Sequence, residues 1–275
     1  MSKHKLSMVS NIKKKRTKKK KSSKRKQKLN IIDVSVDTTI NLGTKASPGN
    51  IGYHYQQYSN IFEFIKRIIY KDKKLQKIIC IPDIGEGWMQ SFLRLHFYKL
   101  SSKKYGMKSI KPVDSQVTKN KFIREIKKCS YSRLVPINLQ IIVPDIGTHS
   151  NIILLDNKKK TIELFEPHGN RGNKSKLESI SGAYFKVSKN VKRYFEIYLP
   201  EYKYIPPSKY EPKLGLQARL DVYSGMCVTW SLLWLHYRIL NPDISQNKLI
   251  TYLDTKVTKK FLLQYTKFVE VTLKY

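Results

Sequence analysis

The sequence predicts an α+β fold, with helices at both ends and a group of strands between them. Residues 58–70 place apolar side chains at helical spacing, residues 139–166 contain three consecutive strand patterns, and residues 227–240 form an apolar run of helical length. Strands grouped apart from helices along a chain are typical of the α+β class. The length of 275 residues suits one large domain, or one domain with a smaller addition.

The charge is strongly basic and unevenly distributed. The chain has 54 Lys and Arg residues against 20 Asp and Glu residues, a formal net charge of +34. Residues 1–28 hold 14 of the basic residues and no acidic residue, so residues 1–29 are expected to be a disordered tail. The rest of the chain still carries a net charge of +20. Nucleic acid is therefore an expected partner, through the tail and the basic surface.

Residues 30–133 are expected to form a mostly helical N-terminal region. Folding should begin between Asn30 and Tyr53, after a connector with Gly43, Pro48 and Gly49. Residues 101–133 are polar and predict no element. The expected elements are a helix at residues 58–70, a short buried strand at Lys77–Pro82 and an amphipathic helix at Gly87–Leu100.

Residues 134–275 are expected to form a second, catalytic domain. Its central element is an apolar helix that Asn241 and Pro242 should end, because proline cannot continue a helix. The expected strands are Leu139–Val143, Ser150–Asp156 and Thr161–Glu166; the expected helices are Tyr184–Leu199, Cys227–Leu240, Ile244–Leu253 and Val257–Leu273.

His149 and Glu166 lie at the ends of two predicted strands that form a hairpin. With a two-residue turn, paired residue numbers sum to 315 and His149 lies opposite Glu166; with a four-residue loop they sum to 317 and Glu166 is its diagonal neighbour. In both registers the side chains share one face, about 5–8 Å apart. Such a carboxylate can orient an imidazole as a general base, although an isolated pair is more simply an ordinary ion pair.

Cys227 favours the catalytic interpretation of that pair. It begins the apolar helix, where the helix dipole and the unpaired N–H groups favour a thiolate. Cys80 lies in an apolar strand pattern and Cys129 in a Lys-rich segment, so both are interpreted as structural. Three cysteines in a Lys-rich chain without a secretory signal favour a reducing compartment.

These residues resemble the adenovirus-type cysteine proteases (adenain) and the related ubiquitin-like-protein-specific proteases. His149 and Glu166 are 17 residues apart, as in adenain, and Glu166 lies in a similar Leu-Phe-Glu-Pro-x-Gly string at Leu164–Gly169. The Gly-x-Cys-x-x-Trp-Ser run at Gly225–Ser231 looks like the version carried by large DNA viruses. The resemblance covers about residues 136–245. It implies a papain-like core with a mixed sheet packed on a central helix that starts at Cys227.

The resemblance also implies a role for each site residue. Cys227 would be the nucleophile, His149 the general base and then acid, and Glu166 the group that orients His149. The oxyanion hole would use the Cys227 backbone N–H and the Gln217 amide. Gln217 lies ten residues before Cys227, whereas the family glutamine lies six or seven before its cysteine, so Asp221 is kept as the alternative. Ser150 replaces a tryptophan that many relatives have after the histidine.

Other possible functional residues have weaker support in the sequence. His168 also lies near Glu166 and could replace His149 as the base, but it follows a proline and is expected at the surface. His236 is expected to be a core histidine. No Cys/His spacing suggests zinc and no glycine pattern suggests a phosphate loop, so no cofactor is expected. No run of 18 apolar residues suggests a membrane span.

The expected function is that of a thiol endopeptidase of a large DNA virus. The resemblance implies cleavage of virion core precursors after small pairs such as Gly-Gly or Ala-Gly, with DNA as a candidate activator. The alternatives are a protease that removes a ubiquitin-like modifier, an acetyltransferase with the same triad, and a basic virion protein with an inactive site. The expected locations are the virion and the virus factory in the host cytoplasm, or the nucleus.

Overall fold

The computed structural model describes residues 30–36, 59–85, 89–101, 104–145, 147–169, 187–212, 214–220 and 226–274. The basic tail at residues 1–29 and the connector around Pro48 lie outside the described residues. Residues Ile31–Tyr275 form one compact unit. The boundary expected between residues 133 and 134 falls within that unit, where a short 3₁₀ helix leads into the central strand of the sheet.

The described residues form a mixed sheet of six strands in the order β2-β1-β3-β4-β5-β6. The pairs β1–β3 and β5–β6 are parallel, and the other neighbouring pairs are antiparallel. The strands are β1 (Phe92–Ser101), β2 (Lys104–Pro112), β3 (Leu134–Val143), β4 (Gly147–Asp156), β5 (Thr161–Phe165) and β6 (Lys203–Ile205). The three strands predicted between residues 139 and 166 are confirmed as β3, β4 and β5, with β3 beginning earlier than expected.

Two elements of the first half differ from the prediction. The helix predicted over Gly87–Leu100 is wrong, because most of that range belongs to strand β1. Its buried side chains alternate, with Leu93, Leu95 and Phe97 facing the core, and a period of two is that of a strand. The strand predicted over Lys77–Pro82 is reduced to one parallel bridge between Ile79 and Leu134. The region expected to be mostly helical therefore contributes two strands to the sheet.

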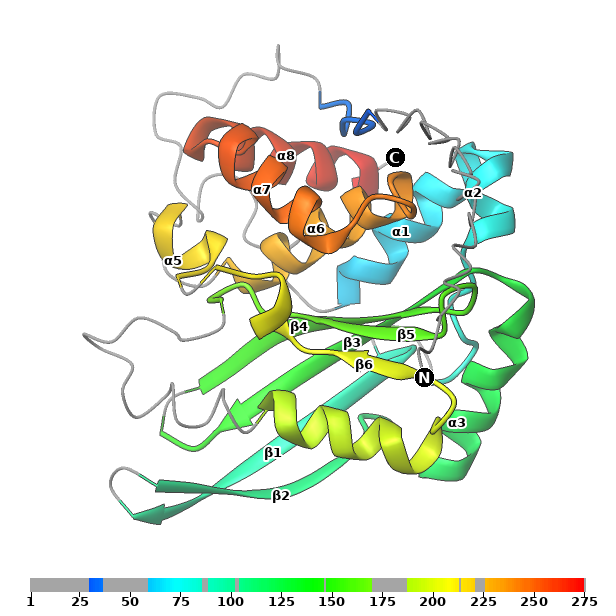
Figure 1. Ribbon diagram of the computed structural model, residues 1–275, viewed down its shortest axis with the longest axis vertical. Coiled ribbons are helices and arrows are strands. Elements are labelled where there is room, and N and C mark those ends of the chain that lie inside the picture. The colour runs from blue at the N-terminus through cyan, green and yellow to red at the C-terminus, as the bar shows by residue number, and fades with distance from the viewer. Residues whose placement is uncertain are drawn as a thin grey trace, which may run out of the picture. The chain divides into compact units, whose positions relative to one another are not determined.

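Helices cover both faces of the sheet (Figure 1). One face packs against α6, with α1, α7 and α8 around it, and the other packs against α3 and a helix over residues 187–198. The longer helices are α1 (Ser59–Lys71), α3 (Lys119–Lys128), α6 (Cys227–Leu240), α7 (Gln246–Lys256) and α8 (Lys259–Lys274). The short ones are α2 (Lys73–Ile78), η3 (Cys129–Tyr131), η4 (Pro207–Lys209) and α5 (Leu216–Leu220).

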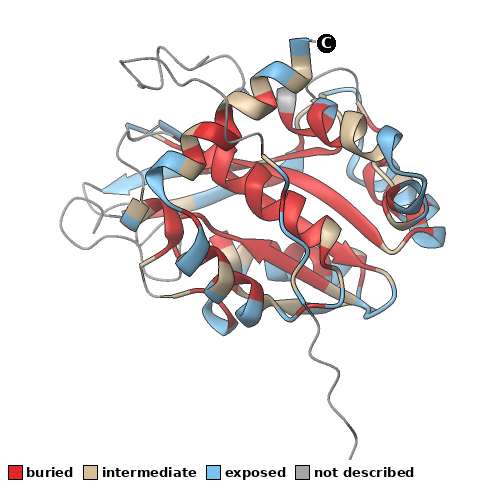
Figure 2. Cartoon of the chain, turned by 90° about the horizontal axis from the view of Figure 1, so that it is seen from above, coloured by how far each residue is buried: buried red, intermediate tan, exposed pale blue. Residues whose placement is uncertain are grey.

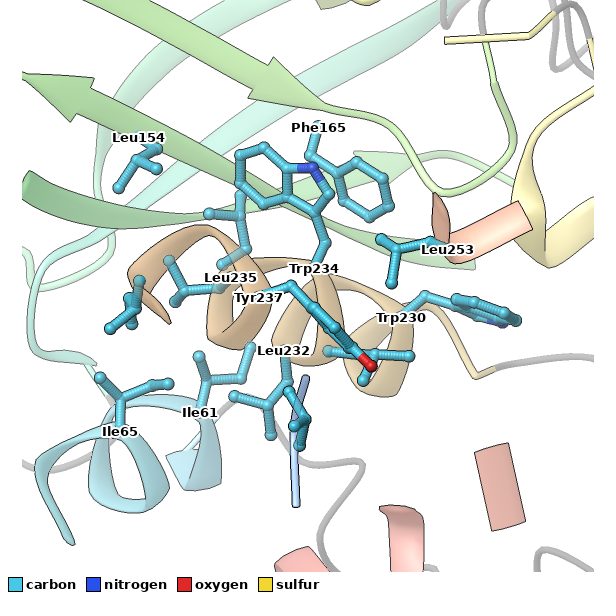
Figure 3. Close-up of a cluster of buried hydrophobic side chains, with 14 of the residues drawn as sticks. Ile61, Ile65, Leu154, Phe165, Trp230, Leu232, Trp234, Leu235, Tyr237 and Leu253 are labelled. Carbon is cyan, nitrogen blue, oxygen red and sulfur yellow. The ribbon is translucent and has the colours of Figure 1, made fainter. Parts of the chain in front are cut away.

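Helix α6 is buried along nearly its whole length, as its apolar sequence predicted (Figure 2). Trp234 stacks on Phe165 of the β5 end, with ring centroids 4.9 Å apart and planes 7° from parallel. On the opposite side of the helix, Ile61 and Ile65 of α1 pack against the same core (Figure 3). The predicted α+β class, with a mixed sheet packed on a central helix that starts at Cys227, is therefore confirmed.

The C-terminal end of α6 is held by a fully buried ion pair. The Arg238 guanidinium donates to both carboxylate oxygens of Glu163 on β5, at 3.1 and 2.8 Å. It also donates to the backbone oxygens of Asn241 and Ile244, and Gln246 Nε2 donates to Glu163 at 2.7 Å. One ion pair thus connects α6, β5 and the start of α7.

Cys80 and Cys129, interpreted as structural, form a disulfide with a Cα–Cα distance of 5.6 Å. It joins the segment after α2 to the start of η3. All three cysteines lie in described parts of the chain, and Cys227 keeps its thiol. Disulfides are rare in reducing compartments, so this bond does not fit the compartment expected from the sequence.

Replacing Glu163 with alanine should lower the free energy of unfolding by about 3–5 kcal/mol, because Arg238 would remain buried without its carboxylate. Denaturant unfolding measures this change. Glu196→Ala, which breaks the exposed pair with Lys192, is the matched control and should cost less than about 1 kcal/mol. Equal losses for the two variants would contradict the assigned importance of the buried pair.

Candidate active site

The three residues predicted to act together come from three different elements. His149 lies in β4, Glu166 follows the last residue of β5, and Cys227 is the first residue of α6. All three are buried, with 5% of His149, 5% of Glu166 and 8% of Cys227 exposed. The chain therefore brings polar, ionisable side chains together in a place almost closed to water.

The hairpin between β4 and β5 decides which of the two predicted registers holds. Ile152 pairs with Phe165 and Asp156 pairs with Thr161, so paired numbers sum to 317. The connection is the four-residue loop, and Glu166 is the diagonal neighbour of His149. The position opposite Glu166, one residue past the ladder, is that of Asn151.

Glu166 is the hydrogen-bond acceptor at the centre of the site. His149 Nε2 lies 2.7 Å from Oε1, and the backbone N–H of His168 donates to the same oxygen at 3.0 Å. Asn151 Nδ2 donates to Oε2 at 2.7 Å. Sequence reasoning missed Asn151, although its position two residues after His149 places it on the same face of a strand. Both carboxylate oxygens are thus fixed by donors.

Cys227 forms a hydrogen bond with His149. Glu166 engages Nε2 of the ring, so Nδ1 is the nitrogen left for the cysteine. Cys227 lies in the first turn of α6, where the backbone N–H groups have no partner within the helix. The result is a continuous chain of contacts from Glu166 through His149 to the sulfur of Cys227.

The charges of the site favour a protonated His149. Burial lowers the pKa of His149, but the Glu166 carboxylate and the hydrogen bond to Cys227 outweigh it and raise that pKa to about 10. Burial raises the pKa of Glu166, but the charge of His149 and the hydrogen bonds from His149 and Asn151 bring it below its ordinary value. The site therefore holds an imidazolium beside the sulfur of Cys227.

His168 lies against the site, not at the surface as expected. Its ring stacks on the ring of His149, with centroids 4.7 Å apart and planes 30° from parallel. Burial and the charge of His149 lower the pKa of His168 to about 4. At neutral pH it is therefore an uncharged ring that covers one face of the imidazolium.

Glu211 is a second buried carboxyl group that sequence reasoning missed. Its Oε1 accepts the backbone N–H of Glu166 at 2.9 Å. Burial, together with the nearby charge of Glu166, raises the pKa of Glu211 well above its ordinary value. A carboxyl group whose charged form is disfavoured therefore accepts the backbone N–H of Glu166. No pattern in the sequence distinguishes Glu211 from an exposed loop residue.

Gln217 lies beside the turn that carries Glu166. Its side chain is buried in the short helix α5, and its backbone N–H donates to Pro167 O at 3.0 Å. Gly215 and Gly169 let the two backbones touch, because a Cβ on Gly215 would collide with the Pro167–Gly169 turn. Asp221, the alternative for the oxyanion hole, lies outside the described residues.

The surrounding residues provide a tightly packed support. Ser150 is completely buried, and its backbone oxygen accepts a hydrogen bond from Ser231 Oγ of α6 at 3.2 Å. His236 lies in the core as expected, where burial lowers its pKa to about 3. Within the described residues, no three His, Cys, Asp or Glu side chains are arranged to hold a metal ion, and no helix is long and apolar enough to cross a membrane.

Comparisons with known proteins give limited matches. No protein-family model matches the chain. A putative ankyrin repeat protein of Acanthamoeba polyphaga mimivirus is 29% identical over 124 residues, which is 39% of this chain and 16% of that protein. Among solved structures, the Chlamydia trachomatis effector protein ChlaDUB1 is similar over 80% of this chain and 73% of its own, with 11% identity and a TM-score of 0.33. Neither similarity identifies the function of this chain.

Glu166→Gln should lower the pKa of His149, because the amide removes the negative charge that holds the proton on the ring. In the unaltered protein His149 should stay protonated through neutral pH and lose its proton as the pH rises through about 10. NMR titration of the imidazole carbons measures both midpoints. Glu201→Gln, an exposed carboxylate, is the control and should leave the midpoint unchanged. Identical midpoints in all three proteins would contradict the assigned role of Glu166.

Gly215→Ala should lower the free energy of unfolding by about 1–3 kcal/mol, because the added methyl group forces α5 away from the Pro167–Gly169 turn. Ser208→Ala, at an exposed position of η4, is the control and should change it by less than about 0.5 kcal/mol. Denaturant unfolding of both variants checks this expectation. A loss no larger for Gly215→Ala than for Ser208→Ala would show that the close approach of the two backbones is not required.

Proposed function

We propose that this protein is a thiol protease in which Cys227 is the nucleophile, His149 the general base and acid, and Glu166 the residue that orients His149. The proposal is carried by one observation, the chain of contacts that joins Glu166, His149 and Cys227 in a buried site. An ordinary cross-strand ion pair would not require a cysteine at a helix N-terminus next to the imidazole. The resemblance of the same three residues to adenain and its relatives supports the proposal.

The proposed reaction proceeds through an acyl-enzyme. The Cys227 thiolate attacks the carbonyl carbon of the substrate, and a C–S bond forms. His149 then gives its proton to the leaving amine as the C–N bond breaks. In the second half, His149 takes a proton from water, the resulting hydroxide attacks the thioester, and the thiolate leaves.

Two donors are proposed for the oxyanion that forms during both attacks. One is the backbone N–H of Cys227, which lies in the first turn of α6. The other is the side-chain amide of Gln217, which α5 carries beside the turn of residues 167–169. Asp221 remains the alternative donor, since a protonated carboxyl group can also donate.

The proposed substrates are proteins with small residues before the scissile bond. Virion core precursors cut after Gly-Gly or Ala-Gly are one class, and conjugates of a ubiquitin-like modifier that ends in Gly-Gly are the other. Both reactions use the same thiolate and the same acyl-enzyme. We propose that the protein acts in the virion, in a virus factory of the cytoplasm or in the nucleus, in keeping with the resemblance to proteases of large DNA viruses.

Cys227→Ala should abolish hydrolysis of a fluorogenic Gly-Gly peptide and of a ubiquitin-like protein carrying the same C-terminal reporter, because no other group supplies the nucleophile. Glu166→Gln should lower kcat/KM by about 10²-fold or more on the better substrate. The exposed carboxylate variant Glu201→Gln is the matched control and should keep full activity. For the unaltered protein, the ratio of the rate on the Gly-Gly peptide to the rate on the ubiquitin-like reporter decides between the two substrate classes.

Two results would contradict the proposed protease. The first is hydrolysis that is unaffected by Cys227→Ala. The second is transfer of the acetyl group from acetyl-CoA to an acceptor protein, dependent on Cys227, with no hydrolysis of either reporter substrate. Resistance of Cys227 to iodoacetamide at neutral pH would favour the inactive virion protein, since a thiolate paired with an imidazolium is alkylated readily.

A further inference from the structure

The hairpin of β1 and β2 carries a polar face that the protease mechanism does not use. Along β1, Arg94, His96 and Tyr98 alternate with the buried residues Leu93, Leu95 and Phe97. Alternation places the three polar and aromatic side chains on one face of the strand. β2 is the edge strand of the sheet, and in Figure 1 the hairpin extends away from α6, α7 and α8.

Positive charges gather on this face without partners of opposite sign. Arg94 lies directly opposite Lys111 in the β1–β2 register, an arrangement that destabilises a sheet by itself. Lys108 lies at the bulge beside His96. Among the described residues, no carboxylate lies within ion-pair distance of Arg94, His96, Lys108 or Lys111.

The surroundings of His96 show that these cations are close to one another. Partial burial lowers the pKa of His96, and the charges of Arg94, Lys111 and Lys108 lower it further. Three cations from two strands therefore act on one imidazole. Arg94 is also held in place, because its Nε donates to Gln140 Oε1 of β3 at 2.7 Å, while its terminal nitrogens have no partner among the described residues. Such a held guanidinium suits a phosphate group.

Tyr98 adds an aromatic ring beside the cations. It pairs with Gly106, and its ring lies over that glycine, because a Cβ there would be 2.5 to 2.7 Å from the ring atoms. The side chain remains 44% exposed. The ring is therefore supported by the backbone of β2 and is open to a partner elsewhere.

We propose that this face of the β1–β2 hairpin binds single-stranded nucleic acid, with phosphates at Arg94, Lys108 and Lys111 and a base stacked on Tyr98. Proteins that bind single strands combine a basic surface with aromatic side chains on which bases stack. An acidic polypeptide would pair with the cations, but its carboxylate side chains cannot stack on the exposed ring of Tyr98. The net charge of +34 gives such a strand long-range attraction. The proposal is independent of the protease activity.

The electrostatic part is tested by the salt dependence of binding. Full-length protein is titrated into a fluorescent 12-nucleotide oligo-dT at several salt concentrations, and anisotropy gives the affinity. Arg94→Gln with Lys111→Gln should reduce the slope of log K against log salt by about 1.4, since each phosphate contact contributes about 0.7. Lys259→Gln with Lys260→Gln, two exposed cations at the start of α8, is the matched control and should not change it. Equal reductions for both pairs would overturn the proposal.

The stacking part is tested at Tyr98. Tyr98→Leu should weaken binding of the oligonucleotide about 5- to 100-fold, and Tyr98→Phe, which keeps the ring, should not. Thermal unfolding by circular dichroism checks that both variants fold. If Tyr98→Leu binds normally and poly-glutamate of equal charge displaces the oligonucleotide, the face is one for acidic polypeptides and the proposal is wrong.

A measurement on the unaltered protein covers the case in which Tyr98→Leu fails to fold. Photocrosslinking with a 5-iodouracil oligonucleotide, followed by peptide mapping, should place a crosslink at Tyr98. Crosslinks confined to residues 1–28 would show that the tail alone binds the strand, which also overturns the proposal.

Discussion

The structure depends on one constraint, namely that α6 has no polar face and must be covered on every side. The sheet covers one side through Leu154 and Phe165, and α1, α7 and α8 cover the others. Helix α6 is held by Ser231 bound to Ser150 near its start and by Arg238 bound to Glu163 at its end. These contacts leave little freedom for its first residue, so Cys227 meets the imidazole of His149. Packing thus sets the geometry of the site.

Within the site, burial disfavours the charged forms of His149 and Glu166, and their mutual attraction opposes that effect. Water is nearly excluded from His149 and Glu166, which would favour their neutral forms. Their mutual attraction at 2.7 Å, together with the donors from Asn151 and the backbone of His168, restores the charged pair. Further out, His168 is uncharged at neutral pH, and burial disfavours the charged form of Glu211, so both reduce competition for the charge of the pair. The arrangement holds the His149–Glu166 ion pair next to the sulfur of Cys227.

The face of the β1–β2 hairpin that carries Arg94, Lys108 and Lys111 has the opposite character, because these charges have one sign and no carboxylate partner among the described residues. Cross-strand repulsion between Arg94 and Lys111 costs stability, and the packing of Leu93 and Leu95 on the other face of β1 offsets it. One strand therefore contributes to the core with one face and presents its charges with the other. This division places a basic face on the same sheet that carries His149.

Features that depend on local pattern could be predicted from the sequence. These are the alternation of β4 and β5, the apolar length of α6 with its end at Leu240, and the order of His149, Glu166 and Cys227 along the chain. The sequence did not predict β1, because Gly87–Leu100 has no turn signal that separates a strand from a helix, and its parallel partner β3 lies about 45 residues later. The hairpin register, the contact of Cys227 with His149, and the roles of Asn151, His168 and Glu211 became known from the folded structure. Those features depend on which distant segments pack together, and no local periodicity encodes that choice.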